Sequence, residues 1–174
     1  MFNLFKKNTT IKIINKVYLT EAIKWNACAE MIKTNANTIF ITWFEETYNS
    51  LNKFLEQHQH NAKVIMYRQA TKNNNVKYVF AEHYPLYAKE EELFNKLGLN
   101  EVVVMCSLDE AFLKHFGSDK IISLLETLGM NKDEVIEHEM ISSSIKNAQT
   151  KLAKQVLIDS AARSQAEWFR KNLI

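Results

Sequence analysis

Glycine is scarce in this sequence: Gly98, Gly117 and Gly129 are the three glycines among 174 residues. Phosphate-binding loops need glycine where a backbone amide approaches a phosphate, in patterns such as GxxxxGK[ST] or GxGxxG. No two of the three glycines have either spacing. The sequence therefore excludes a P-loop and a dinucleotide fingerprint, and we expect no ATP binding, no ATP hydrolysis and no bound cofactor.

Cysteine and long apolar runs are also scarce. Cys28 and Cys106, the two cysteines, fall in a helical and a strand pattern, which argues against a disulfide framework. Residues 1–16 (MFNLFKKNTTIKIINK) interrupt their apolar residues with lysines, unlike a signal peptide. No later run approaches the roughly 18 apolar residues of a membrane helix. We therefore expect a cytoplasmic protein without a transmembrane segment.

The composition is typical of a globular protein. Hydrophobic residues make up 47% of the chain, enough for a sizeable core, and the length indicates one compact domain. The formal net charge is only +2, far below that of a dedicated nucleic-acid binder or a polybasic membrane protein.

Helical and strand patterns alternate in the first two thirds of the chain. Helical spacing covers 20–33, 45–58 and 86–98, and short β-rich runs cover 38–44, 63–68, 76–84 and 101–107. This alternation predicts an α/β fold with a three-layer, mostly parallel sheet. The short link QATKNNN leaves the orientation of the pair 63–68 and 76–82 open, because a parallel crossover usually needs about a dozen residues. That pair is either antiparallel or unusually short-linked.

The last third of the chain has helical patterns alone. Ser107 with Glu110 matches a capping box, and Ser118 and Asn131 are candidate caps for the next two helices. From Met140 onward, apolar residues recur on one helical face, which predicts a long terminal helix reaching Trp168 and Phe169. The members of this stripe are Ile141, Ile145, Ala148, Leu152 and Val156.

A specific motif lies in FGSDKIISLLETLGMNKDEVIEHEMISSSIKNAQTKL, residues 116–152. It resembles the junction between the second nucleotide-binding domain and the helical scaffold of SecA, the preprotein translocase motor, which also has FGS, an LGM turn, IEH and I-x-N-A-Q-x-K. Residues 17–33 (VYLTEAIKWNACAEMIK) are similar to the helix that opens that domain, and SLDEAFLKHFG is similar to its strand exit. The match between these segments is weaker.

The resemblance implies a RecA-like fold, with residues 1–115 as a degenerate helicase C-terminal domain and 116–174 as the start of the scaffold, in one compact unit. Where the family has an arginine-rich stretch that closes on ATP, this chain has EHYPLYAKEEELFNKLGLNE, with carboxylates at Glu90, Glu91 and Glu92. Carboxylates oppose the developing charge of phosphoryl transfer. No catalytic residue carries over, so we expect a non-catalytic interaction or scaffold module, with protein export as the process that the resemblance suggests.

A candidate crevice lies where the strands end, because open α/β sheets bind ligands outside the carboxyl ends of their strands. Its predicted members are Thr42, Glu82, His83, Tyr84, Cys106 and Ser107. If Glu82 orients His83 and His83 activates Cys106, the chain is a small enzyme with a nucleophilic cysteine. A packed crevice edge with an inert, buried cysteine explains the same residues without chemistry.

Two other features, a histidine pair and a glutamate run, have simple structural interpretations, whereas the terminal helix and its basic residues leave a binding role open. His58 and His60 lack the further ligands of a metal site, and Glu90 to Glu92 are typical of an exposed helix face. The terminal helix could fold back, pair with another copy or bind a protein partner through Ile145, Trp168 and Phe169. Its lysines and arginines leave a nucleic-acid-binding accessory protein as an alternative, with strongly salt-dependent affinity.

Overall fold

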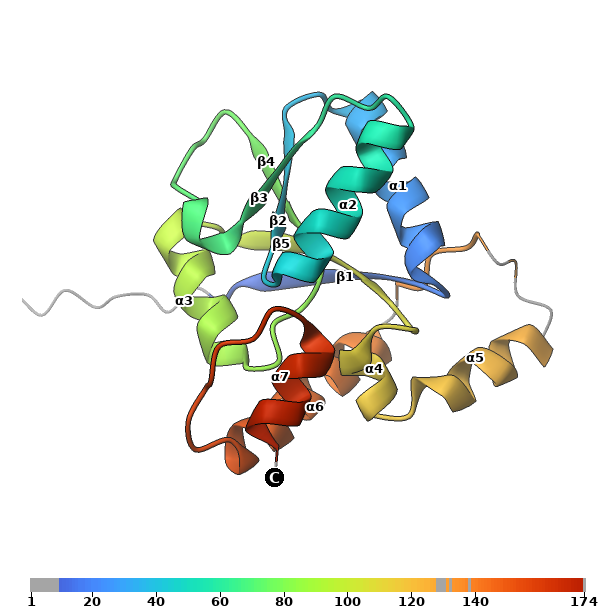
Figure 1. Ribbon diagram of the computed structural model, residues 1–174, viewed down its shortest axis with the longest axis vertical. Helices are drawn as coiled ribbons and strands as arrows, with labels where there is room; N and C mark the ends of the chain where they lie inside the picture. The colour runs from blue at the N-terminus through green and yellow to red at the C-terminus, as the bar shows by residue number, and fades with distance from the viewer. Residues whose placement is uncertain (1–9, 128–130, 132, 138, 174) are drawn as a thin grey trace, which may run out of the picture.

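A five-stranded parallel sheet forms the centre of the protein (Figure 1). The computed structural model describes residues 10–127, 131, 133–137 and 139–173. The sheet order is β1-β5-β4-β2-β3, and each neighbouring pair of strands is parallel. The strands are β1 (Lys12–Tyr18), β2 (Thr38–Thr42), β3 (Lys63–Met66), β4 (Lys77–Phe80) and β5 (Glu101–Ser107).

Helices cover both faces of the sheet, so the predicted three-layer α/β architecture is confirmed and is consistent with a RecA-like domain. One face packs against α1 (Glu21–Thr34) and α2 (Glu45–Gln57). The other packs against α3 (Tyr87–Leu97), α4 (Ala111–His115), α6 (Glu139–Gln155) and α7 (Gln165–Asn172). The helices after residue 116 thus share a core with the sheet.

Alternation along β5 places side chains in both layers of the core. Val102, Val104 and Cys106 are buried toward α3 and α6, whereas Met105 is buried toward α1 and α2. A strand with both faces covered is nearly continuously apolar, as EVVVMCS is. Each fully buried valine or methionine contributes about 1.5–3 kcal/mol.

The short link after β3 does not join neighbouring strands. β3 and β4 are both parallel to β2 and lie on opposite sides of it, which decides the orientation that the sequence left open. The link contains the 3-10 helix η1 (Tyr67–Gln69) and runs from the carboxyl end of β3 to the amino end of β4. The pair is therefore parallel and unusually short-linked, with ten residues between Met66 and Lys77.

Two predicted helix ends, at Thr20 and Gly98, are confirmed, and the predicted cap at Ser107 is wrong. Thr20 caps α1 by accepting a hydrogen bond from the Ile23 amide, and Gly98 ends α3 with φ of 71°, a left-handed conformation that favours glycine. Glu110, rather than Ser107, occupies the N-cap position of α4. The Glu110 carboxylate accepts a hydrogen bond from the Ser107 amide at 3.0 Å. Ser107 and Glu110, the residues of the predicted capping box, therefore close a turn that precedes α4.

Ser118 and Asn131, the next two predicted caps, differ in whether a helix begins there. Ser118 begins α5 (Ser118–Thr127), and its hydroxyl donates to the Leu108 carbonyl. Asn131 begins no helix, because α6 starts at Glu139. Of the SecA-like motif, Leu128 to Met130, Lys132 and His138 lie outside the described residues.

Strand β1 was not among the predicted elements, although it pairs with β5 along its whole length. Its sequence KIINKVY mixes lysines with apolar residues because it is an edge strand with part of its surface exposed. The Ile136 backbone covers the far edge of β1 through two hydrogen bonds with Val17, of 2.8 and 3.1 Å. A residue of the SecA-like motif therefore closes the edge of the sheet.

The predicted continuous terminal helix is wrong. Helix α6 ends at Gln155, residues 156–164 form an irregular segment, and α7 is a separate short helix that Ser164 caps by accepting from the Glu167 amide at 3.0 Å. Contacts of Asp159 with the sheet domain turn the chain back at this point. Within the described part of the chain, no helix is long and apolar enough to cross a membrane.

Candidate functional site

Most of the predicted crevice residues gather at one edge of the sheet. Thr42 ends β2, Cys106 and Ser107 end β5, and residues 82–84 follow β4, so all of them lie toward the carboxyl ends of parallel strands. The Thr42 hydroxyl donates to the Ile65 carbonyl at 3.4 Å. Glu82, His83 and Tyr84 are at most 3% exposed. The predicted crevice residues thus follow strands that end at the same edge, with contacts that differ from those expected.

Glu82 joins the end of β4 to the start of α2. Its Oε1 accepts hydrogen bonds from the amides of Trp43 and Phe44, both at 2.9 Å, and its Oε2 accepts from the Thr47 hydroxyl at 2.6 Å. Burial raises the pKa of this carboxyl from 4.5 to about 7, although these hydrogen bonds act in the opposite direction. Glu82 therefore satisfies the free amides at the beginning of α2, and it does not contact His83 in the way that the sequence predicted.

His83 is the centre of a second buried network. Its Nδ1 lies 2.9 Å from Glu90 Oε1 and its Nε2 lies 2.7 Å from Asn15 Oδ1. Glu90 is fully buried and also accepts from the Tyr84 amide and the Gln149 side chain. The prediction that Glu90 lies on an exposed helix face is wrong, because its carboxylate has three donors inside the protein. The network ties β1, α3 and α6 to the end of β4.

Cys106 does not form the predicted dyad. Both ring nitrogens of His83 are occupied by Glu90 and Asn15, and the orienting carboxylate is Glu90 in place of Glu82. The thiol is fully buried, and this burial raises its pKa well above the usual value. A thiol in such surroundings is held in the neutral form, which is a poor nucleophile.

The SecA-like helix α6 supplies part of the His83 network. Gln149 Nε2 donates to Glu90 Oε2 and to the Tyr84 carbonyl, both at 2.8 Å. Ile145 and Ala148 are buried in the core beside it. The I-x-N-A-Q pattern therefore holds α6 against the sheet through two apolar residues and one buried amide.

A cleft opens at the same edge, where β2 and β4 are neighbours but their outgoing connections run to opposite sides of the sheet. This is the topological switch point at which open α/β sheets place ligands. We call it the aromatic cleft; its volume is about 280 Å³. Its lining residues are Trp43, Phe44, Glu45, Met66, Tyr67, Arg68, Tyr84, Lys89, Asp159, Ala161, Ala162 and Arg163.

Aromatic rings form the floor of the aromatic cleft. The Trp43 ring centroid lies 5.0 Å from that of Tyr67 and 5.3 Å from that of Tyr84, and Phe44 stacks on Tyr84 at 5.6 Å. Packed rings of this kind add about 0.5–1.5 kcal/mol per pair beyond their buried area. The floor is therefore rigid, and it is built from residues that follow three different strands.

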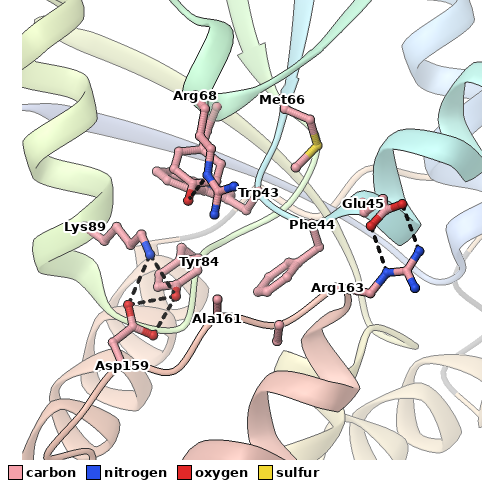
Figure 2. A pocket seen from close by; sticks show the side chains of 12 residues that line it. Trp43, Phe44, Glu45, Met66, Arg68, Tyr84, Lys89, Asp159, Ala161 and Arg163 are labelled. Atoms are coloured by element: carbon pink, nitrogen blue, oxygen red, sulfur yellow. Dashed lines mark hydrogen bonds and ion pairs between the residues drawn. The ribbon is translucent and has the colours of Figure 1, made fainter.

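Charged side chains surround this floor (Figure 2). Lys89 with Asp159 lies on one side, and Glu45 with Arg163 lies on the opposite side. Arg163 donates to both Glu45 oxygens at 2.8 and 2.9 Å. The third cation, Arg68, has its guanidinium 5.2 Å from the Tyr67 ring.

The irregular segment after α6 forms one wall of the aromatic cleft. Asp159 accepts from the Tyr84 hydroxyl at 2.6 Å and from Trp168 Nε1 at 2.8 Å. Trp168 is fully buried and Phe169 is half-buried, so α7 folds back onto its own domain. Trp168 is therefore not available as an exposed anchor for a protein partner, as the sequence had suggested. The strongly exposed apolar residues nearby are Leu157 and Ile158.

An acidic crevice lies next to the aromatic cleft, with a volume of about 240 Å³. Its only buried cation among the lining residues is Lys24, which pairs with Glu110 and donates to the Ala81 carbonyl at 2.9 Å. Burial lowers the pKa of Lys24, but the Glu110 carboxylate outweighs this effect and raises it overall. The carboxylates of the crevice are Glu21, Glu46, Glu82, Asp109 and Glu110.

His58, considered and rejected as a metal ligand on sequence grounds, lies at the end of α2. Its ring stacks on Phe54 at 4.2 Å and its Nδ1 lies 2.8 Å from the Phe54 carbonyl. Within the described residues, no three histidine, cysteine or acidic side chains are arranged to hold a metal ion.

Sequence reasoning missed the residues that give the aromatic cleft its charge. Arg68 fell inside a predicted strand, 63–68, which ends at Met66 in the structure. A strand end at Met66 would have placed Tyr67 and Arg68 at the carboxyl edge. Asp159 and Arg163 had no usable signal, because the sequence predicted a helix through them.

Comparison with other proteins relates part of the chain to SecA. No family model matches. The chain is 44% identical over 55 residues to the protein translocase subunit SecA of Chlorobium phaeovibrioides, covering 32% of this chain and 5% of that protein. It is 30% identical over 136 residues to SecA of Anaplasma phagocytophilum, covering 75% of this chain and 15% of that protein.

A third relative gives the same result over a shorter segment. The protein translocase subunit SecA 1 of Alkaliphilus metalliredigens is 48% identical over 46 residues, covering 26% of this chain and 5% of that protein. The chain thus spans only a small part of the length of the relatives it matches. It contains a SecA-like region.

Proposed function

We propose that this chain is a degenerate counterpart of the second nucleotide-binding domain of SecA that acts in protein export by binding a protein partner, without binding or hydrolysing ATP. The observation that carries the proposal is that buried carboxylates occupy the carboxyl edge of the parallel sheet. Glu82, Glu90 and Glu110 lie there, each hydrogen-bonded to the protein itself. The SecA-like region supports the link to export.

The electrostatics of this edge oppose nucleotide binding. A triphosphate needs backbone amides or clustered cations, whereas the amides of Trp43 and Phe44 already donate to Glu82. In the acidic crevice, Lys24 is already paired with Glu110. We therefore expect no measurable heat of binding in calorimetry with ATP and Mg²⁺. A dissociation constant in the low micromolar range would contradict the proposal.

The export link is tested by crosslinking and affinity capture from the native cell. The immobilised chain should enrich a reproducible protein partner that belongs to the export machinery. A matched control is the Glu90→Lys variant, because a buried ammonium in place of the carboxylate that accepts from Tyr84 and Gln149 should unfold the domain and abolish the capture. Enrichment of the same proteins by both chains, or of no export component, would argue against the proposed role.

A further inference from the structure

The aromatic cleft combines an aromatic floor with one cation that has no carboxylate partner within the described residues. Lys89 lies 3.2 Å from Asp159, and Arg163 forms two hydrogen bonds with Glu45. Arg68 forms no salt bridge within the described residues, and its Nε donates to the Tyr67 hydroxyl at 2.9 Å. The remaining donors of its guanidinium are therefore available to an anion from outside.

A second, independent feature is an indole without a partner. Trp43 is 2% exposed and lines the aromatic cleft, and within the described part of the chain its buried Nε1 has no hydrogen-bond acceptor. An unsatisfied buried donor costs about 1–3 kcal/mol. Among the buried side-chain nitrogen and oxygen atoms that lack a partner within the described residues, it is the only one whose residue lines the aromatic cleft.

We propose that the aromatic cleft binds a short peptide segment of a partner protein in which an apolar or aromatic side chain lies beside a carboxylate. The side chain contacts Tyr67, the ring of the floor that keeps exposed surface, and the carboxylate pairs with Arg68. The inference rests on the proposed protein-binding function and names the chemistry of the partner. The cleft volume of about 280 Å³ is at the lower end of ligand pockets, as expected for one inserted side chain.

The surroundings favour a peptide over a nucleic acid. Successive bases stack on several exposed ring faces, whereas Tyr67 is the one ring of the floor with more than 3% of its surface exposed. Glu45 and Asp159 also line the cleft and would repel successive phosphates of a strand. One carboxylate next to one apolar side chain matches a site with a single unpaired guanidinium.

Fluorescence anisotropy with labelled heptapeptides tests the proposal. The probes are SGDFDGS, its charge-reversed form SGKFKGS and its form without the aromatic ring, SGDSDGS. We expect SGDFDGS to bind with a dissociation constant on the order of 10–100 µM, and the other two to bind at least about tenfold more weakly. Equal binding of all three, no binding at millimolar protein, or tighter binding of oligouridine than of SGDFDGS would overturn the inference.

Arg68→Glu and Arg170→Glu form a matched pair of variants. Both arginines are exposed, but Arg170 lies on α7 and does not line the aromatic cleft. Arg68→Glu should weaken SGDFDGS about tenfold or more and improve SGKFKGS, whereas Arg170→Glu should change neither affinity by more than about twofold. Equal losses in the two variants would show that general charge, and not the cleft, attracts the peptide.

The same variants separate the two proposals. If affinity capture of the export partner fails for the wild-type chain, the proposed function is wrong. If the wild type captures that partner and Arg68→Glu captures it equally well, the function stands and the aromatic cleft is not its binding site. Loss of the partner with Arg68→Glu and retention with Arg170→Glu supports the inference.

Discussion

The Tyr84 hydroxyl donates to Asp159, with Oδ1 at 2.6 Å and Oδ2 at 2.8 Å, although 75 positions separate the two residues in the chain. Burial raises the pKa of the Asp159 carboxyl, but hydrogen bonds from Tyr84 and Trp168 outweigh this effect and lower it overall. Lys89 approaches the same carboxylate at 3.2 Å. This cluster attaches the segment after α6 to the sheet domain and so builds one wall of the aromatic cleft.

Tyr84→Phe should loosen that attachment. The variant removes the hydroxyl that donates to Asp159 and accepts from Trp168 Nε1, at a cost of about 1–3 kcal/mol in the free energy of unfolding. Urea denaturation measures the loss, and limited proteolysis should cleave faster within 156–164. Tyr48→Phe on α2 is the control, because Tyr48 does not belong to this cluster. Equal stability of Tyr84→Phe and wild type would contradict the role of the hydroxyl.

Glu90→Gln should be strongly destabilising, whereas the same change at its neighbours should not. Glu90 accepts from His83, the Tyr84 amide and Gln149 with no exposure to solvent, and an amide cannot accept from all three donors. We expect a loss of about 2–4 kcal/mol. Glu91→Gln and Glu92→Gln, on the exposed side of α3, should stay within about 0.5 kcal/mol of wild type.

Thermal unfolding followed by circular dichroism distinguishes these three variants. For a chain of this size, each kcal/mol corresponds to a shift of about 2–4 °C in Tm. A Tm of Glu90→Gln within about 2 °C of the two neighbours would mean that the buried network adds little to stability.

Glu82 should make stability depend on pH. Its carboxyl has a pKa of about 7 in the folded protein against 4.5 ordinarily, so the folded state binds more protons between these values. Stability is therefore fully present below about pH 4.5 and falls as the pH rises to about 7. The pKa difference corresponds to about 3 kcal/mol at most.

Glu82→Gln tests this dependence. A neutral amide imitates the protonated acid, because its oxygen can still accept from the amides of Trp43 and Phe44. Urea denaturation at pH 5, 6, 7 and 8 should show a smaller fall for the variant than for the wild type. Parallel curves for the two proteins would rule out Glu82 as the titrating group.

Charge substitutions separate folding from self-association. Ile145 is 3% exposed in the core, so Ile145→Asp should cost more than about 3 kcal/mol and cannot report on association alone. Leu157 and Ile158 are 95% and 78% exposed, so the double change to Asp should leave the urea midpoint unchanged. If an apolar contact between copies exists, analytical ultracentrifugation should detect a lower mass for this double variant. A wild-type monomer at high micromolar concentration would eliminate such a contact.

Local patterns in the sequence were sufficient for most of the elements. The helices α1, α2 and α3 and the strands β2 and β5 have regular apolar spacing, which arises because one side of a helix, or both sides of a central strand, must be buried. The edge strand β1 was not predicted, because its partly exposed surface accommodates lysines that interrupt the regular apolar spacing. The glycine count alone excluded the phosphate loops.

The outcome for the terminal segment depended on contacts distant in sequence. The apolar stripe from Ile141 to Leu152 forms α6, but the helix stops at Gln155, and the chain turns where Asp159 meets Tyr84 and Trp168. A helical pattern contains no information about a partner 75 positions away. The break in the helix is therefore a property of the folded domain.

The sequence by itself determined the α/β class and the positions of most strands and helices. The tertiary structure alone decided that Glu90 is buried against His83, that β2 separates β3 from β4, and that Arg68 lies beside the aromatic floor. The physical reason is the distance along the chain over which each feature is determined. Secondary structure follows from the spacing of apolar residues within a few helical turns or a few strand residues. The pairing of polar groups depends instead on which side chains the folded sheet brings within hydrogen-bond distance.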